Sequence, residues 1–128
     1  MIVVSNTSPL CYLVLIGCAP VLPELYGEVA TTETVLAELR HADAPPAVRT
    51  WAAAPPEWLK IHSDPVPRDS TLADLDPGER TAMWLAEQLG ADVVLLDEAA
   101  ARTLASQRGL GVAGTLGVLR DAAQAGLL

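Results

Sequence analysis

Five polar residues stand where predicted strands and helices of this chain begin or end, and their types suit the binding of a hard cation. They are Asn6, Glu38, Glu79, Asp97 and Glu98. Metal-assisted hydrolysis of a phosphodiester needs several carboxylates on one or two divalent ions, which polarise the phosphoryl group, activate a water and stabilise the leaving oxygen. Oxygen ligands favour magnesium or manganese. The spacing alone is a weak signal, because acidic residues at element ends also have structural roles.

Each acidic residue has such a structural interpretation. Asp76 and Glu79 have the spacing of a capping box, in which the later carboxylate reaches back to the N–H of the cap residue, and the pattern supports this reading and a site role equally. Asp97 could cap the helix that follows it, where the helix dipole would favour Glu98. Glu38 could be an exposed helix residue one step from an apolar stripe.

Asn6 has the strongest local case for a functional role. It follows an apolar strand predicted over residues 1–4, and Ser8 followed by Pro9 predicts the N-cap and first position of the next helix. Because Ser8 would supply the cap, Asn6 is left over as a polar group at a buried strand end. A metal site built at the carboxyl ends of the strands would normally use a carboxylate at this position, so the amide of Asn6 departs from that arrangement.

Strand and helix signals alternate along the whole chain. Strands are predicted near residues 1–4, 28–30, 58–62, 92–96 and 110–113, and helices near residues 9–16, 19–26, 31–40, 76–90, 98–107 and 115–124. This alternation predicts one α/β domain over residues 1–128, with a mostly parallel sheet of about five strands and helices on both faces. The carboxyl ends of such strands meet at one edge. We therefore expect Glu38, Glu79 and Asp97 to converge within metal-bridging distance near Asn6.

Residues 43–67 form a proline-rich segment with six of the ten prolines. Two proline pairs, Pro45-Pro46 and Pro55-Pro56, bracket a predicted short helix, and residues 58–62 alternate like an edge strand. We interpret the segment as a surface insert on a single domain, because neither side of it is large enough for a core of its own.

The composition restricts the class of partner and compartment. Sixteen acidic against eight basic residues give a net charge of −8, which disfavours non-specific electrostatic binding of nucleic acid. The chain shows no signal-peptide pattern and no apolar run of the ~20 residues that a membrane span needs. Cys11 and Cys18 would lie ~10 Å apart on a helix, beyond the ~7 Å reach of a disulfide. A cytoplasmic protein with buried thiols is expected.

Other chemistries have weaker support. The glycines at positions 111, 114 and 117 do not have the dinucleotide-binding spacing and favour turns and close helix packing. His41 and His62 are isolated and have no zinc-like partners nearby. Cys11 lies inside a predicted helix and is more typical of a core residue than of a nucleophile.

Taken in order, these residues resemble the PIN-domain ribonucleases. Residues 3–10 (VVSNTSPL) are similar to the opening of that family, whose usual form has Asp where Asn6 stands. The later segments that carry the resemblance are 35–39, 75–79, 95–98 and 114–119. Together they span essentially the whole chain, and the resemblance is greatest to an uncharacterised prokaryotic branch related to the toxins of VapBC-type toxin–antitoxin pairs.

The resemblance implies a Rossmann-like fold and a magnesium- or manganese-dependent RNA endonuclease, the toxin of such a pair. It assigns metal ligands to Asn6, Glu38, Glu79 and Asp97, of which the three acids are also catalytic. It assigns supporting roles to Ser8, Glu98 and Thr115. It further implies an RNA substrate, a small antitoxin protein as partner, a homodimer and no membrane attachment.

Two hypotheses of different class remain open. The first is the metal-dependent ribonuclease, and the second is a PIN-like binding or regulatory module with weakened catalysis, which Asn6 favours. The three retained acids favour the enzyme, because a module that no longer binds metal would be stabilised by losing carboxylates that repel one another. An asparagine can still ligate a divalent ion through its carbonyl oxygen. We therefore expect weak binding of Mg²⁺ or Mn²⁺.

Overall fold

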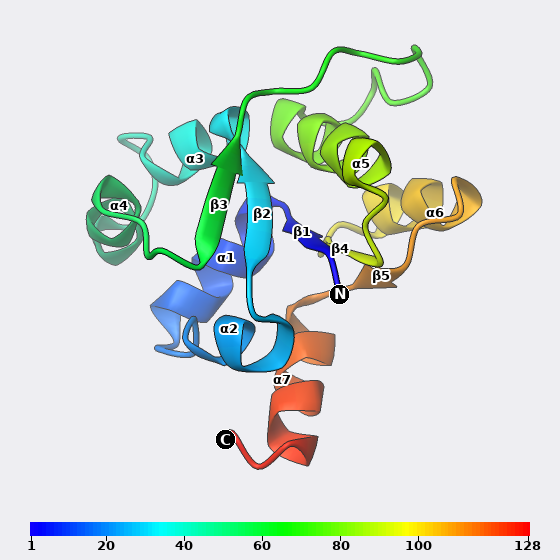
Figure 1. The fold of residues 1–128 in the computed structure, drawn as a ribbon. Coiled ribbons are helices and arrows are strands. Elements are labelled where there is room, and N and C mark those ends of the chain that lie inside the picture. The colour runs from blue at the N-terminus through cyan, green and yellow to red at the C-terminus, as the bar shows by residue number, and fades with distance from the viewer.

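A five-stranded, all-parallel sheet forms the centre of the molecule, in a computed structural model that describes residues 1–128 (Figure 1). Its strand order is β3-β2-β1-β4-β5. The strands are β1 (Val3–Ser5), β2 (Val29–Thr32), β3 (Leu59–His62), β4 (Val93–Leu95) and β5 (Val112–Ala113). The chain adds strands outward on one side of β1 and then on the other, so the strand order reverses between β1 and β4. The predicted α/β fold with a parallel five-stranded sheet is confirmed.

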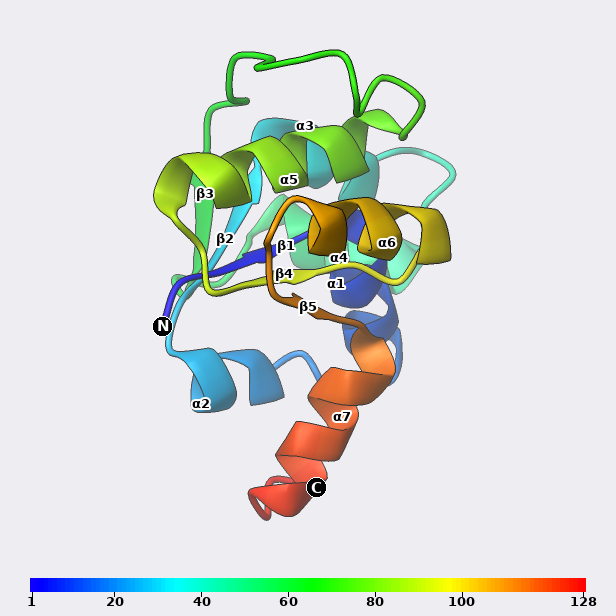
Figure 2. The same ribbon diagram turned by 90° about the vertical axis from the view of Figure 1, so that its right-hand side faces the viewer.

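Helices cover both faces of the sheet, so the domain has three layers (Figure 2). They are α1 (Thr7–Leu15), α2 (Val21–Tyr26), α3 (Glu33–Leu39), α4 (Pro46–Ala53), α5 (Pro77–Leu89), α6 (Ala99–Gln107) and α7 (Thr115–Gln124). Successive strand residues point to opposite faces. Val3 accordingly joins a core cluster with α1, α2, α3, α4 and α7, whereas Val4 joins a second cluster with α5 and α6.

Helix α1 begins two residues earlier than predicted. Asn6 occupies the N-cap position without a side-chain cap bond, and Ser8 and Pro9 lie inside the first turn. The prediction that Ser8 caps the helix and Pro9 starts it is therefore wrong. A proline is tolerated anywhere in the first turn because its missing N–H would have no partner in the helix, so it does not fix the starting residue.

The proline-rich segment is part of the core rather than a surface insert. Its predicted helix and edge strand are both present, as α4 and β3. Val48 and Ala52 of α4 and Leu59 of β3 are buried in the first core cluster. Strand β3 pairs in parallel with all four residues of β2. The prolines end the elements, but the apolar residues between them still pack inward, which the proline count concealed.

Two further expectations concern the cysteines and the membrane. Cys11 and Cys18 are both free and half-buried, so no disulfide joins them, although neither is fully buried as predicted. None of the helices has the length and apolar character that crossing a membrane requires.

Candidate metal and phosphodiester site

The carboxyl ends of β1 and β4 bring Asn6 and Asp97 to the same edge of the sheet. Ser5 and Leu95 are paired at the ends of these strands. The Asn6 backbone N–H donates to the Leu95 carbonyl at 3.0 Å and extends the pairing by one residue. This edge, where the strand order reverses, is the usual ligand-binding edge of an open parallel sheet.

The side chain of Asn6 is buried with an unused hydrogen-bond acceptor. The residue is 4% exposed, and its Oδ1 atom has no hydrogen-bond partner in the protein. The neighbouring backbone is satisfied, since the Ser5 carbonyl accepts the Thr31 hydroxyl at 2.7 Å. Leaving a buried polar group unpaired costs about 1–3 kcal/mol. Such an oxygen at a ligand-binding edge is a candidate for coordinating a cation.

Gly78 lies beside both this oxygen and the Glu38 side chain. Glu38 is half-buried in the last turn of α3, and its Oε1 atom accepts a short hydrogen bond from the Thr7 hydroxyl. A Cβ atom at Gly78 would lie 3.0 Å from Asn6 Oδ1 and would overlap Glu38 Oε1. Only a glycine therefore lets the first turn of α5 approach both side chains without displacing them.

Glu79 is buried at the start of α5 and forms the predicted capping box with Asp76. The Glu79 N–H donates to Asp76 Oδ1 at 2.9 Å, and the Asp76 N–H donates to Glu79 Oε1 at 3.3 Å. Glu79 is only 5% exposed. Burial, followed by the negative charge of Asp76 and with a further contribution from Glu98, raises the pKa of Glu79 to about 7. A strongly shifted carboxyl group is typical of functional sites, although a structural cap can also produce one.

Asp97 connects the end of β4 to the start of α7. It is half-buried and accepts the Thr115 N–H and the Thr115 hydroxyl, each at 2.7 Å. The alternative reading of Asp97 as the cap of the helix directly after it is wrong, because the exposed Glu98 holds that cap position and makes no side-chain cap bond. Asp97 instead accepts a hydrogen bond from the first residue of α7, which lies eighteen residues later in the chain. Its interaction with Thr115 gives both residues a fixed place at the site.

The three acids do not form a finished carboxylate cluster. The structure contains no group of three or more His, Cys, Asp or Glu side chains arranged to hold a metal ion. The expected convergence of Glu38, Glu79 and Asp97 within metal-bridging distance is therefore not present. Each carboxylate instead accepts a hydrogen bond from a nearby residue: Glu38 from Thr7, Glu79 from Asp76 and Asp97 from Thr115. Repulsion between like charges also opposes closer approach.

The sequence did not identify two residues of this region. Thr7 donates a hydrogen bond to Glu38, and Gly78 leaves space beside Asn6 and Glu38. Thr7 directly follows Asn6, and Gly78 directly precedes Glu79, so adjacency to a candidate residue was the available signal in both cases. A pocket of about 400 Å³ opens beside Thr7 and Glu38.

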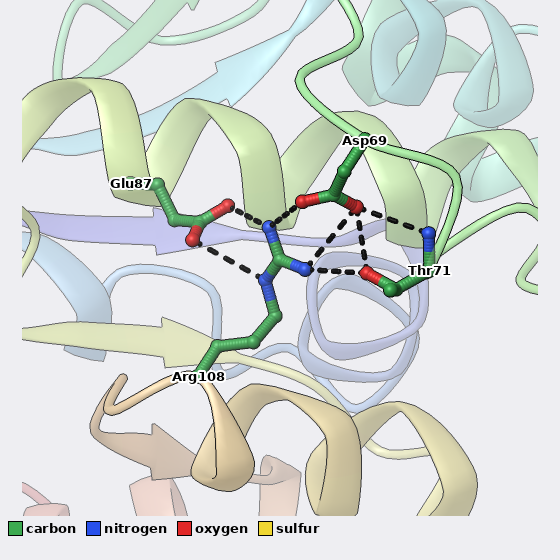
Figure 3. A network of polar contacts seen from close by, with 4 residues as sticks. All are labelled: Asp69, Thr71, Glu87 and Arg108. Carbon is green, nitrogen blue, oxygen red and sulfur yellow. Dashed lines mark hydrogen bonds and ion pairs between the residues drawn. The ribbon is translucent and has the colours of Figure 1, made fainter.

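An arginine-centred network holds the segment that leads into α5 (Figure 3). The Arg108 guanidinium donates to Glu87 at 2.6 and 3.2 Å, to Asp69 at 3.0 and 3.4 Å, and to the Thr71 hydroxyl at 2.7 Å. The hydrogen bonds from Arg108 are the main reason why the pKa of Asp69 falls to about 2. The network ties residues 69–71 to α5 and to the end of α6, and so fixes the approach to the capping box at Asp76.

One known protein family matches almost the whole chain. A family model whose description is PIN domain matches residues 2–128. No curated protein matches the sequence.

Proposed function

This chain belongs to the PIN domain family, and from its site geometry we propose that it is a divalent-metal-dependent RNA endonuclease. The family is of nuclease type, and its members generally use divalent metal ions. We further propose that the metal is Mg²⁺ or Mn²⁺ and that the protein is the toxin of a toxin–antitoxin pair acting on RNA in the cytoplasm.

The observation that carries the proposal is the unpaired, buried Asn6 Oδ1 atom. It faces the gap that Gly78 leaves open beside Glu38. Asp97 follows the neighbouring strand at the same edge. All of these donors are oxygens, which fits a hard divalent cation with water completing its coordination. Because the three acids do not form one cluster, we assign Asn6, Glu38, Glu79 and Asp97 to its binding partly through bound water, with Ser8, Glu98 and Thr115 as supporting residues.

The chain's own residues would divide the chemistry between them. When bound, a divalent cation supplies an activated water and neutralises charge on the phosphate. Asp97 is held in one orientation by Thr115, and Glu38 by Thr7. In the protein alone, burial raises the pKa of the Glu79 carboxyl group. A bound cation would hold this carboxylate ionised, as a metal ligand has to be.

A second candidate function is a binding or regulatory module with little catalysis. Asn6 favours it, because an amide has one acceptor oxygen and no net charge where the site has room for a carboxylate. The absence of a grouped carboxylate trio favours it as well. The enzyme and the module differ in whether restoring one negative charge at position 6 produces activity.

The test is therefore Asn6→Asp compared with the parent protein. We expect the added carboxylate to tighten Mn²⁺ binding by at least about 10–100-fold, because disturbing even groups that merely support a ligand has effects of that size. Calorimetric titration with Mn²⁺ measures the affinity, and cleavage of a labelled single-stranded RNA measures activity. Gln124→Glu is the matched control, since it makes the same amide-to-carboxylate change at an exposed position at the end of α7.

A second substitution identifies the nuclease site. Asp97→Asn in the Asn6→Asp background should abolish cleavage while the protein stays folded. An asparagine keeps an acceptor for the Thr115 N–H, and the Thr115 hydroxyl can accept from the new amide. Equal Mn²⁺ affinity and equal cleavage in the parent and Asn6→Asp would contradict the assignment of Asn6. Tighter metal binding without cleavage would favour the module.

We also propose a homodimer and a small antitoxin protein as partner. Helix α1 and the residue after it expose three large apolar side chains, namely Tyr12, Leu15 and Ile16, at 51, 47 and 55%. Apolar side chains grouped on a surface are typical of protein–protein contacts. This face of α1 is the surface that we assign to self-association.

A further inference from the structure

Half of the basic side chains of this acidic protein are already bound to other parts of it. Of the eight basic residues, four have partners in other parts of the chain, namely Arg40, Lys60, Arg80 and Arg108. Arg49, Arg68 and Arg102 make no hydrogen bond or ion pair within the protein. Arg120 has only a contact of 3.6 Å with the adjacent Asp121, and both side chains are solvent-exposed. Few cations thus remain to meet a polyanion.

Two of the four arginines that have no partner elsewhere in the chain line one pocket, although they come from different helices. Arg102 of α6 and Arg120 of α7 border a pocket of about 360 Å³, which we call the arginine pocket. Its other lining residues include Asp97, Gly114, Leu116 and Gly117. A side chain at position 114 would fill the space beside Asp97, because a Cβ there would lie 2.9 Å from Asp97 Oδ1 and 3.5 Å from Arg102 Nη1.

The backbone adds positive character to the same pocket. Gly114 is the N-cap residue of the ten-residue helix α7 and offers no side-chain cap. The first N–H groups of a helix have no acceptor within it, and the helix dipole makes this end positive. Asp97 takes the Thr115 N–H, which leaves those of Leu116 and Gly117 in the pocket lining without a helical partner. Because both Asp97 oxygens accept hydrogen bonds from Thr115, its charge is partly compensated.

We propose that the arginine pocket binds a phosphodiester group of the RNA backbone, adjacent to the phosphate at the candidate metal site. The inference rests on the proposed function, because Asp97 belongs to both places. Arginine is well suited to phosphate, since its planar fork of N–H donors matches the phosphate oxygens. The two guanidinium groups offer a local anchor that the net charge of −8 does not suggest. RNA is held at one point rather than over a broad basic surface.

The expected effect follows from counterion release. Each phosphate contact to a single strand changes the slope of log affinity against log salt by about 0.7. At about 0.1 M salt, losing one such contact weakens binding about fivefold. The double variant Arg102→Gln with Arg120→Gln should therefore bind at least about fivefold more weakly and show a flatter salt dependence by about 0.7 or more.

Fluorescence anisotropy with a short labelled single-stranded RNA tests this without any cleavage. The titrations contain a chelator and are repeated over a range of salt concentrations. Arg49→Gln is the matched control, since it removes the same charge from an exposed position on helix α4 and lines neither pocket. A Lys pair at positions 102 and 120 keeps the charge, so it should retain most of the salt dependence. Both arginines are exposed, so the variants should fold normally, which circular dichroism verifies.

A single-stranded DNA of the same sequence distinguishes the contacted group. A phosphate contact predicts the same arginine dependence for DNA and RNA, whereas dependence with RNA alone would indicate a ribose hydroxyl and overturn the phosphate assignment. Undiminished affinity in the double variant, a loss equal to that of Arg49→Gln, or no RNA binding by the parent would also overturn it.

The outcome is separable from that of the proposed function. Arginine-dependent binding without cleavage by the Asn6→Asp variant would retain the phosphate pocket and reject the nuclease. Cleavage by Asn6→Asp with arginine-independent RNA affinity would retain the nuclease and reject the pocket.

Discussion

Glu79→Gln should remove a pH-dependent loss of stability from the protein. The pKa of Glu79 is raised from its usual 4.5 to about 7, chiefly by burial. The folded state thus holds a proton that the unfolded chain releases between these two pH values. Stability falls as pH rises wherever the folded state binds more protons. The folded protein therefore loses stability through this window, and the loss is nearly complete at about pH 8.

The size of the effect follows from the shift. The whole shift corresponds to about 3 kcal/mol, and about 2 kcal/mol of it develops between about pH 5.5 and pH 8. A glutamine at position 79 cannot ionise, but it keeps the oxygen that accepts the Asp76 N–H in the capping box. Any cost of burying its amide is the same at every pH. The change in the stability difference with pH therefore isolates the ionisation.

Urea unfolding of the parent and Glu79→Gln at several pH values in this range measures the difference. We expect the variant to gain about 2 kcal/mol relative to the parent from low to high pH. The control is Glu33→Gln, which removes a charge from the first turn of α3 at an exposed position. A parent–variant difference that stays constant with pH would refute the reasoning, because Glu79 would then be ionised in the folded protein at every pH tested.

Three further predictions concern the Arg108 network and the exposed face of α1. Arg108→Gln should cost about 1–3 kcal/mol of stability, because it removes charge-assisted hydrogen bonds of a mostly buried side chain. Limited proteolysis should then cut the variant near Asp69. Resistance to proteolysis equal to that of the parent would mean that the network does not hold this segment. Since the pKa of Asp69 is lowered to about 2, its contribution is present above about pH 4 and should disappear as pH falls towards 2. The loss should be smaller in Arg108→Gln, where only the hydrogen bonds from Thr71 still lower this pKa. Leu15→Glu should convert the proposed dimer to a monomer, and sedimentation showing a monomeric parent at tens of micromolar would contradict the dimer.

The fold could be predicted because its signals are local. Helix α5 has a capping box at Asp76 and Glu79 and a left-handed glycine at Gly90, where φ is 63°, so both of its ends were readable from a few adjacent residues. The start of α1 could not be predicted in this way, because a proline in the first turn is compatible with several starting positions of the helix. The buried side of α4 was missed for a similar reason, since proline pairs mark where elements end and not which residues pack inward.

The candidate site was only partly predictable. The sequence correctly indicated Asn6 as a polar group left over at a strand end, but for a wrong reason, because Ser8 is not the cap. The bond between Asp97 and Thr115 joins residues eighteen positions apart. It depends on how the start of α7 packs beside the end of β4, and no local pattern encodes that distance. Sequence patterns locate candidate residues more readily than they reveal which neighbour satisfies each one.

The arginine pocket illustrates the same limit for charge. Counting charges predicts poor binding of nucleic acid, because the count treats all cations as equivalent. The structure distinguishes them, because Arg108 is bound by two carboxylates. Arg102 has no partner, Arg120 has only an exposed contact with the adjacent Asp121, and both border the same pocket. Counterion release depends on the few phosphates that are contacted and not on the net charge of the protein. An acidic chain can therefore hold RNA weakly at one point, and its long-range repulsion would limit that binding to substrates with a phosphate placed to reach both arginines.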